Sequence, residues 1–324
     1  MKMTGKAKCT PIDSIEKIVL SGTVQWISLR TENSDNPLIL FLHGGPGTAQ
    51  ISFSRKSQKP LEKDFIVVNW DQRGAGKSYD KNIKKEEMTI DRFILDAEEL
   101  IMCLLSRFNQ EKVFLAGHSW GSIIGIKLAA KRPDLIRAYI GIGQIVDMDR
   151  GETVSYNFTL NEAIRRNHKK AERDLRKIGP PPYAHPQDAG VQRKWLSKFN
   201  GSTYRGSIIG TILKNLTLSD TSPADLVKFV RGAIFSLTCL EEEQTQVNIK
   251  VEIGQLFVPV YFCCGRRDYN VPFELVVEYF NTLVAPEKEM VWFERSAHLL
   301  NFEQPDEFCS FCSGLRKRYK LMKT

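Results

Sequence analysis

The sequence predicts an α/β protein with a mostly parallel central sheet, helices on both faces of that sheet, and an inserted helical segment. Three observations support this prediction. Short apolar runs of strand length alternate with helical segments in both halves of the chain, a pattern typical of parallel sheets. One such run, residues 112–116, leads directly into a helical pattern. Between residues 147 and 253 the alternation stops, and no strong strand pattern remains.

The first part of the chain contains most of the predicted strands. Six segments have the length and apolar character of strands: residues 17–20, 25–30, 38–42, 65–70, 112–116 and 136–142. The clearest helix spans Thr89 to Phe108, because its apolar residues recur with i, i+3, i+4, i+7 spacing and Thr89 is suited to be its N-cap. A second helix follows the fifth strand, over residues 122–132.

Alternation of strands and helices resumes after residue 253. Strands are expected at 258–264 and 290–293, and helices at 272–283 and from residue 305 onward. We therefore predict three segments. Residues 1–146 form the first part of the α/β core, residues 147–253 form an inserted helical cap, and residues 254–324 form the second part of the core.

Composition limits the class of protein. A chain of 324 residues that is 42% hydrophobic can bury a large core. Residues 1–9 are polar and basic, so we expect no signal peptide. The sequence has no run of about eighteen apolar residues, so we expect no transmembrane helix and no membrane partner. These observations together predict a cytoplasmic protein.

Charge and cysteine content suggest neither a nucleic-acid partner nor a metal. The net charge is +8, and basic residues cluster at 165–177 and 316–323. The first cluster alternates with acidic residues and contains no aromatic residue, as expected of a solvated helix face. Of seven cysteines, Cys309 and Cys312 form a C-x-x-C without a second ligand pair. We therefore expect no metal or other cofactor.

The segment Gly117-His118-Ser119-Trp120-Gly121 is the most informative motif. It joins a strand to a helix, which forces the central serine into a strained conformation with positive φ, and glycines on either side remove side chains that would clash. Such a turn places the hydroxyl above the N-terminus of the following helix, where a developing anion is favoured. An ordinary glycine-rich strand-to-helix turn is the alternative.

A nucleophilic serine requires a histidine base and a carboxylate that orients the base. The five histidines are His43, His118, His168, His185 and His298. The first two lie at a strand end and beside Ser119 itself, and the next two lie in the predicted cap. His298 follows the last strand, at the sheet edge where the serine emerges, so we predict that it is the base.

The carboxylate is expected after the preceding strand, because the ends of neighbouring parallel strands meet at one edge. Asp268 occupies that place, 30 residues before His298. The resulting order Ser…Asp…His is that of α/β-hydrolases. Glu274 and Asp306 are weaker alternatives, since both belong to predicted helices beyond the edge.

A glycine-rich loop can supply the oxyanion hole. In His43-Gly44-Gly45-Pro46-Gly47, three glycines let backbone N–H groups approach a substrate carbonyl. We predict that the N–H groups of Gly45 and Trp120 bind the oxyanion. Phosphate binding is disfavoured, because neither G-x-G-x-x-G nor G-x-x-x-x-G-K-[ST] spacing is present.

Three motifs together resemble the proline iminopeptidase (prolyl aminopeptidase) group of serine peptidases, which have the α/β-hydrolase fold. They are residues 43–47, the segment Asp71-Gln72-Arg73-Gly74-Ala75-Gly76-Lys77-Ser78, and residues 117–122. The resemblance extends to residues 265–268 and 297–298. It implies that Ser119, Asp268 and His298 form a catalytic triad, with Gly45 and Trp120 as the oxyanion hole. The segment from Asp71 resembles the structural turn of that group.

The resemblance fades over residues 147–253. Proline iminopeptidases hold the free amino terminus of the substrate with acidic cap residues. Glu152, Glu162 and Glu241 are candidates by charge and location, and Gly44 is a further candidate for substrate contact. A solvated position on a helix is the alternative for each glutamate.

The function predicted from these residues is that of a serine hydrolase, in which an aminopeptidase acting on short peptides is favoured. A carboxylesterase or lactonase acting on small molecules would use the same machinery and is the alternative. A ligand-binding protein on a hydrolase scaffold is disfavoured, because all three triad residues are present. A serine at position 119 argues against a dehalogenase or an epoxide hydrolase, which would need aspartate there. The sequence does not predict the oligomeric state.

Overall fold

The computed structural model describes residues 10–321, and its centre is one twisted sheet. Eight strands form the sheet: β1 (Ile12–Leu20), β2 (Thr23–Thr31), β3 (Leu38–Leu42), β4 (Ile66–Asp71), β5 (Val113–His118), β6 (Ile136–Ile142), β7 (Val260–Gly265) and β8 (Lys288–Phe293). Their spatial order is β1-β2-β4-β3-β5-β6-β7-β8. Strand β2 pairs antiparallel with β1 and β4, and all other pairs are parallel. The predicted mostly parallel sheet is confirmed.

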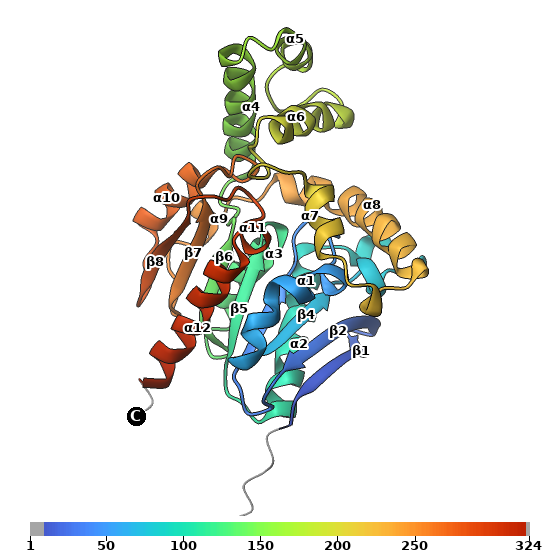
Figure 1. Cartoon of the computed structure of the whole chain (residues 1–324), viewed down its shortest axis with the longest axis vertical. Helices are drawn as coiled ribbons and strands as arrows, with labels where there is room; N and C mark the ends of the chain where they lie inside the picture. Colours follow the sequence, from blue (N-terminus) through green and yellow to red (C-terminus); the bar gives the residue numbers. More distant parts are fainter. Residues whose placement is uncertain (1–9, 322–324) are drawn as a thin grey trace, which may run out of the picture.

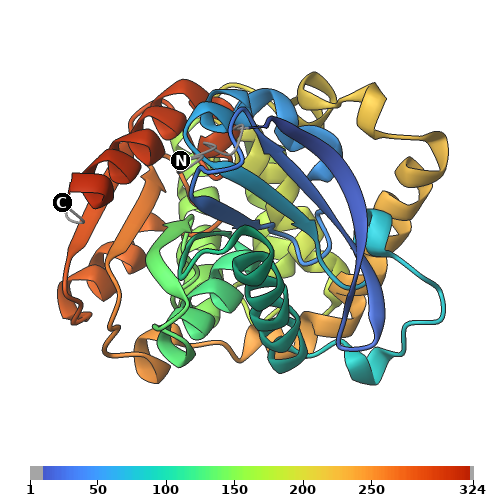
Figure 2. The same cartoon turned by 90° about the horizontal axis from the view of Figure 1, so that it is seen from below.

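Helices cover both faces of this sheet (Figures 1 and 2). The helices of the core are α1 (Ile51–Gln58), α2 (Ile90–Phe108), α3 (Trp120–Lys131), α10 (Phe273–Thr282), α11 (Leu300–Glu303) and α12 (Pro305–Leu321). Four short 3-10 helices are η1 (Lys59–Lys63), η2 (Gly76–Ser78), η3 (Lys85–Glu87) and η4 (Leu218–Asp220). Apolar side chains of α2, α3 and α10 bury one face of the sheet, and those of α12 bury the other.

Local sequence explains where the long helix α2 begins and ends. The Thr89 side chain accepts a hydrogen bond from the Arg92 backbone N–H at 3.2 Å, as expected of an N-cap. The helix ends at Asn109, which adopts the left-handed conformation that asparagine tolerates. The predicted N-cap is confirmed.

The segment between β6 and β7 consists of helices joined by loops. It contains α4 (Met148–Arg165), α5 (Lys169–Ile178), α6 (Pro186–Lys198), α7 (Ile208–Asn215), α8 (Pro223–Thr245) and α9 (Ile249–Glu252). Figure 1 shows α4, α5 and α6 as a lobe above the sheet, with α7 and α8 lower down on one side. The lobe has a small apolar cluster of its own, which includes Tyr156, Leu175 and Trp195.

Some expectations fall partly or wholly outside the described residues. These are the absence of a signal peptide at residues 1–9 and the end of the basic tail at 322–323. Among residues 10–321, no helix is both long enough and apolar enough to cross a bilayer.

Candidate active site

Ser119 lies at a sharp turn between β5 and α3. Its φ is 51° and its ψ is −119°, so the predicted positive φ is confirmed. Such a conformation is strained for a residue with a side chain. The flanking glycines permit it. A Cβ on Gly117 would lie 2.5 Å from the carbonyl oxygen of Gly121, and a Cβ on Gly121 would lie 2.2 Å from that of Leu42. Both positions therefore require glycine.

Hydrogen bonds hold this turn in place. The Ser119 N–H donates to the carbonyl oxygen of Ile142 at 2.9 Å. The Ser122 hydroxyl donates to the Ser119 carbonyl oxygen at 2.6 Å and accepts from the Ile145 N–H at 2.9 Å. The strained backbone is thus fixed by the neighbouring strand β6 and by the loop that follows it.

His298 and Asp268 meet beside this turn. The imidazole Nδ1 of His298 lies 2.9 Å from Oδ2 of Asp268. The other carboxylate oxygen, Oδ1, accepts the N–H groups of Asn270 at 3.0 Å and Val271 at 2.8 Å. Three donors therefore satisfy a carboxylate that is almost fully buried. The structure joins His298 to Asp268, and not to the alternatives Glu274 and Asp306.

His118 connects the serine turn to the His298 loop. Its Nε2–H donates to the carbonyl oxygen of His298 at 2.9 Å, and the two imidazole rings lie 4.9 Å apart. Burial, together with the neighbouring His298, lowers the pKa of His118 to about 3, so its ring is neutral. The residue before Ser119 thus fixes the backbone of the residue that pairs with Asp268.

The glycine-rich loop packs directly against Ser119. A Cβ on Gly44 would lie 3.2 Å from the Ser119 Cβ, so glycine allows the loop to approach the serine closely. Gly45 has φ 120° and lines the same cavity as Ser119. Trp120 begins α3, so its N–H has no acceptor within that helix and is free to bind an anion.

A cavity of about 720 Å³ opens above Ser119. Its floor includes Ser119 and Gly45, and its walls come from the inserted helices α4, α6 and α8 and from the start of α10. Apolar side chains contribute much of the lining: Ile145, Val146, Met148, Leu237, Val271 and Leu275. A cavity of this size, with a serine at its base, suits a small organic molecule or a short peptide.

The three predicted glutamates have different surroundings. Glu152 lines the cavity and forms an ion pair with Arg193, while its Oε2 is buried without a partner among the described residues. Glu241 also lines the cavity, and it is exposed. Glu162 is not among the lining residues; its carboxylate pairs with Arg165 and Arg166. The cavity therefore brings together two of the three.

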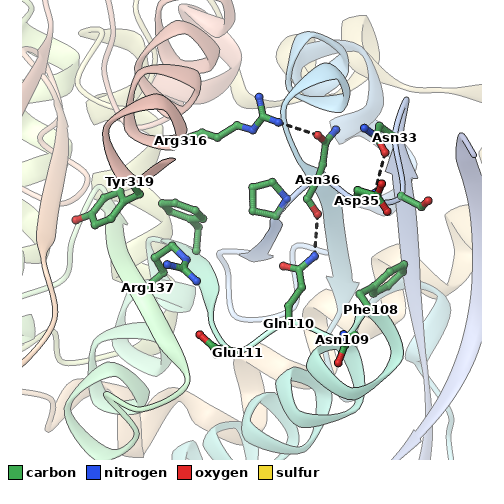
Figure 3. Close-up of a pocket in the computed structure, with 13 residues that line it drawn as sticks. Asn33, Asp35, Asn36, Phe108, Asn109, Gln110, Glu111, Arg137, Arg316 and Tyr319 are labelled. Atoms are coloured by element: carbon green, nitrogen blue, oxygen red, sulfur yellow. Dashed lines mark hydrogen bonds between the residues drawn. The ribbon is translucent and has the colours of Figure 1, made fainter. Parts of the chain in front are cut away.

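A second cavity of about 800 Å³ lies at the opposite end of the sheet, beside the starts of β3 and β5 (Figure 3). Two of its polar side chains bond to Asn36, one to the backbone and the other to the side chain. Gln110 Nε2 donates to the Asn36 carbonyl oxygen at 2.8 Å, and Arg316 donates to Asn36 Oδ1 at 2.9 Å. Neither Ser119 nor Gly45 is among the described residues that line it. The cavity above Ser119 is therefore the better candidate for an active site.

Comparison with known proteins identifies the family. Residues 37–207 match the protein family described as alpha/beta hydrolase fold. The chain belongs to this family. It is 35% identical over 301 residues to the probable aminopeptidase YbaC of Bacillus subtilis, a match that covers 92% of this chain and 95% of that relative. It is 24% identical to a proline iminopeptidase of Heyndrickxia coagulans, over 86% of this chain and 89% of the relative.

Solved structures of other α/β hydrolases share the fold. The proline iminopeptidase of Mycobacterium smegmatis superposes with a TM-score of 0.64 at 15% identity, covering 96% of this chain and 100% of that one. A haloalkane dehalogenase variant from Bradyrhizobium elkanii gives 0.63 at 16% identity, covering 97% and 100%. Because enzymes of different chemistry fit equally well, these structures show the fold alone. The family and its peptidase relatives identify the protein as a hydrolase, and the resemblance to the proline iminopeptidase group is confirmed.

In this hydrolase, the segment that begins at Asp71 supports the turn at Ser119. Gln72 Nε2 donates to the His43 carbonyl oxygen at 3.0 Å, and Gln72 Oε1 accepts from the Trp120 indole N–H at 3.0 Å. Arg73 is buried and donates two hydrogen bonds to Asp96, at 2.8 and 3.0 Å. The segment therefore connects the glycine-rich loop to the residue after the serine.

Sequence reasoning missed two residues that hold the His298 loop, Ser202 and Glu303. The His298 N–H donates to the carbonyl oxygen of Ser202 at 3.2 Å. Glu303 accepts the N–H groups of Ala297 and Tyr204, and so joins the loop to the inserted segment. No motif marks Ser202 or Glu303, because one acts through its backbone and the other lies in an ordinary helical turn.

Proposed function

We propose that this hydrolase uses Ser119 as its nucleophile, His298 as the general base and Asp268 as the group that orients the base. The hydrogen bond between His298 and Asp268, beside the strained serine turn, is the observation that carries the proposal. Because Nδ1–H donates to the carboxylate, Nε2 keeps the lone pair that can accept the serine proton. Burial of Asp268 keeps this bond away from competing water.

The reaction follows from these roles. Ser119 Oγ attacks the substrate carbonyl carbon as its proton passes to His298 Nε2, and the Gly45 and Trp120 N–H groups bind the resulting oxyanion. The imidazolium then donates its proton to the leaving group, which departs and leaves an acyl-enzyme. Water, deprotonated by His298, hydrolyses the acyl-enzyme and regenerates the Ser119 hydroxyl.

We propose an aminopeptidase that releases N-terminal residues from short peptides, with residues 147–253 serving as a cap over the cavity. The peptidase relatives support this substrate class. The cavity supports it as well, because an ammonium group removed from water needs a carboxylate partner. Glu241 is the stronger candidate for that partner, since Glu152 already pairs with Arg193.

A carboxylesterase or lactonase is the second candidate. It is favoured by the apolar lining contributed by Ile145, Val146 and Leu275, which would accommodate an acyl chain without any charged partner. The two candidates differ in one physical requirement. An aminopeptidase needs a carboxylate that binds the free amino group, whereas an esterase does not.

Purified protein tested on aminoacyl-nitroanilides, including the proline derivative, and on short-chain nitrophenyl esters distinguishes the two. We expect turnover of the anilides, and its loss in Ser119→Ala with no change in melting temperature. Turnover of esters alone would refute the peptidase proposal. Activity that survives Ser119→Ala would refute the mechanism.

A pair of variants tests the amino-group contact. Glu241→Gln is expected to raise KM for substrates with a free amino group about tenfold, which corresponds to roughly 1.4 kcal/mol of lost binding. Glu162→Gln is the matched control, because Glu162 pairs with arginines and does not line the cavity. Equal effects of the two substitutions, or an equal effect of Glu241→Gln on esters, would remove Glu241 from this role.

A further inference from the structure

Helix α8 belongs to the inserted segment, yet it is bonded to the core near both of its ends. Near its start, Lys77 Nζ donates to Asp225 Oδ2 at 2.7 Å, and the Lys228 ammonium donates to the Lys77 carbonyl oxygen at 3.2 Å. Near its end, Glu243 accepts the backbone N–H of Ile90 at 2.8 Å. Because Lys77 lies in the segment that supports the serine turn, the position of α8 is tied to that turn.

The middle of α8 lies against the glycine-rich loop. A Cβ on Gly47 would lie 2.8 Å from the Ala233 Cα, 2.8 Å from the Ser236 Cβ and 3.0 Å from the Gly232 carbonyl oxygen. Gly47 also has φ 86°, a conformation that favours glycine. The loop therefore packs directly on the helix, and no long side chain lies between them that could rotate to relieve a clash.

Two small residues of α8 allow this close approach. Gly232 and Ser236 are both buried, and they lie about one helical turn apart. A Cβ on Gly232 would lie 2.7 Å from the carbonyl oxygen of Gly74, and the Ser236 hydroxyl donates to the same oxygen at 3.2 Å. A larger side chain at either position would push α8 away from the core, and so away from Gly47.

The other end of the loop contacts Ser119. A Cβ on Gly44 would lie 3.2 Å from the Ser119 Cβ, and the Thr48 N–H donates to the Gly44 carbonyl oxygen at 3.1 Å, which closes the loop into a tight turn. Gly45, a proposed oxyanion donor, lies between the Ser119 contact at Gly44 and the α8 contact at Gly47. Groups that stabilise a transition state must be held to within about 0.5 Å, so both contacts matter for the Gly45 N–H.

We propose that α8 supports the oxyanion hole, and that Gly232 and Ser236 are positioning residues which keep the Gly45 N–H at hydrogen-bond distance from the oxyanion. This inference rests on the proposed function, in which that N–H binds the oxyanion. It gives α8 a role in the reaction besides its place in the cavity wall, to which Leu237 contributes. Because the oxyanion forms only when the carbonyl is attacked, loss of this support lowers kcat and leaves KM unchanged.

Two substitutions enlarge the face of α8 that contacts the loop, Gly232→Ala and Ser236→Val. Each should lower kcat about tenfold, which is less than the roughly 100-fold or greater loss on removing an oxyanion donor outright. Two matched controls should keep the wild-type kcat. Gly314→Ala also lies within a helix, but its Cβ would meet no heavy atom within 4 Å, and Ser236→Ala adds no volume. Circular dichroism spectra verify that all four variants fold.

An aldehyde that corresponds to the acyl part of the best substrate separates oxyanion binding from a general loss of structure. Its adduct with Ser119 places an oxygen in the hole, whereas the same molecule without its carbonyl group does not. In Gly232→Ala and Ser236→Val the inhibition constant of the aldehyde should rise about tenfold, and that of the second compound should stay unchanged. Equal changes for both compounds, a rise in KM alone, or an unchanged kcat in both variants would overturn the proposal.

Hydrogen exchange tests the support without a substrate. Peptides that cover residues 43–50 should exchange faster in Gly232→Ala and Ser236→Val than in the wild type or Gly314→Ala, because the bond from the Thr48 N–H to Gly44 loses its support. Unchanged exchange would overturn the proposal. A wild type that hydrolyses neither anilides nor esters would instead refute the proposed function, and exchange would still decide whether α8 holds the loop.

Discussion

Gly265, the last residue of β7, is the position where the structure makes its sharpest prediction. A Cβ placed there would lie 2.0 Å from the carbonyl oxygen of Ala297, 2.8 Å from its carbonyl carbon and 2.9 Å from the carbonyl oxygen of Ser296. Real Cβ atoms essentially never come closer than 3.0 Å to such atoms. In Gly265→Ala, the peptide of Ala297 must therefore move by about 1 Å, because it belongs to the backbone and cannot rotate away.

The displaced peptide immediately precedes His298, the proposed base. A shift of this size moves the imidazole relative to Asp268 and Ser119, whose contacts depend on distances such as the 2.9 Å between His298 Nδ1 and Asp268 Oδ2. A misplacement of about 1 Å costs on the order of 100-fold in rate, or about 2.7 kcal/mol in activation free energy. We expect Gly265→Ala to lower kcat by about this factor while KM changes little. Overpacking should also lower the free energy of unfolding by about 1–3 kcal/mol.

Steady-state kinetics on the best substrate and urea unfolding measure the two effects separately. Gly254→Ala is the control, because a Cβ on Gly254 meets no heavy atom within 4 Å. The reasoning is refuted if Gly265→Ala keeps kcat within twofold of the wild type. It is also refuted if Gly254→Ala loses activity to the same extent.

Three further predictions concern the groups around the site. Arg73→Met leaves the buried Asp96 carboxylate without its ion-pair partner. The free energy of unfolding, measured in urea, should fall by about 3–5 kcal/mol, and replacing Asp96 with leucine as well should recover most of this loss. Full stability of Arg73→Met would contradict the prediction. Because burial lowers the pKa of His118 to about 3 from 6.5, its contribution to stability is present above pH 6.5 and is lost as pH falls. Between pH 7 and pH 5 the free energy of unfolding of the wild type should therefore fall by about 2 kcal/mol more than that of His118→Gln. Equal falls in the two proteins would contradict this prediction. Glu303 accepts the backbone N–H groups of Ala297 and Tyr204, and Glu303→Gln leaves one of these two donors without an acceptor. In this variant kcat should fall about tenfold while KM stays unchanged. A change in KM alone would argue for a role in substrate binding.

The central strands were predictable from the sequence because a parallel strand buried on both faces is a continuous apolar run. Leu38–Leu42 and Ile136–Ile142 match the structure residue for residue. The edge strand β1 runs from Ile12, five residues before its predicted start, because most of its side chains are partly exposed and lack a clear apolar pattern. Helix α1 was not predicted: its sequence is polar, and no side chain caps its N-terminus.

Some residues of the candidate site could likewise be predicted from the sequence, and others could not. Residues with distinctive chemistry in a local motif, such as Ser119, could be found from the sequence. The pairing of His298 with Asp268 could also be found, because parallel strand ends meet at one edge. Contacts made by backbone groups could not be found, since any residue can supply a carbonyl oxygen. Ser202 is the example, because it holds the His298 N–H through its carbonyl oxygen alone.

Besides lining the cavity, the inserted segment holds the loops of the proposed site. Gly201 accepts the N–H of Tyr269, the residue after Asp268, at 2.9 Å, and Ser202 accepts the N–H of His298. One short stretch of the insertion therefore binds both loops that carry the proposed base and its carboxylate. The insertion cannot move away as a single rigid body without breaking these bonds. The α4–α6 lobe has an apolar cluster of its own and makes a different kind of contact with the core, in which the Phe158 ring stacks on Tyr269 at 3.6 Å. Substitutions in residues 201–204 should for this reason affect the chemistry, whereas those in the lobe should affect which substrate enters.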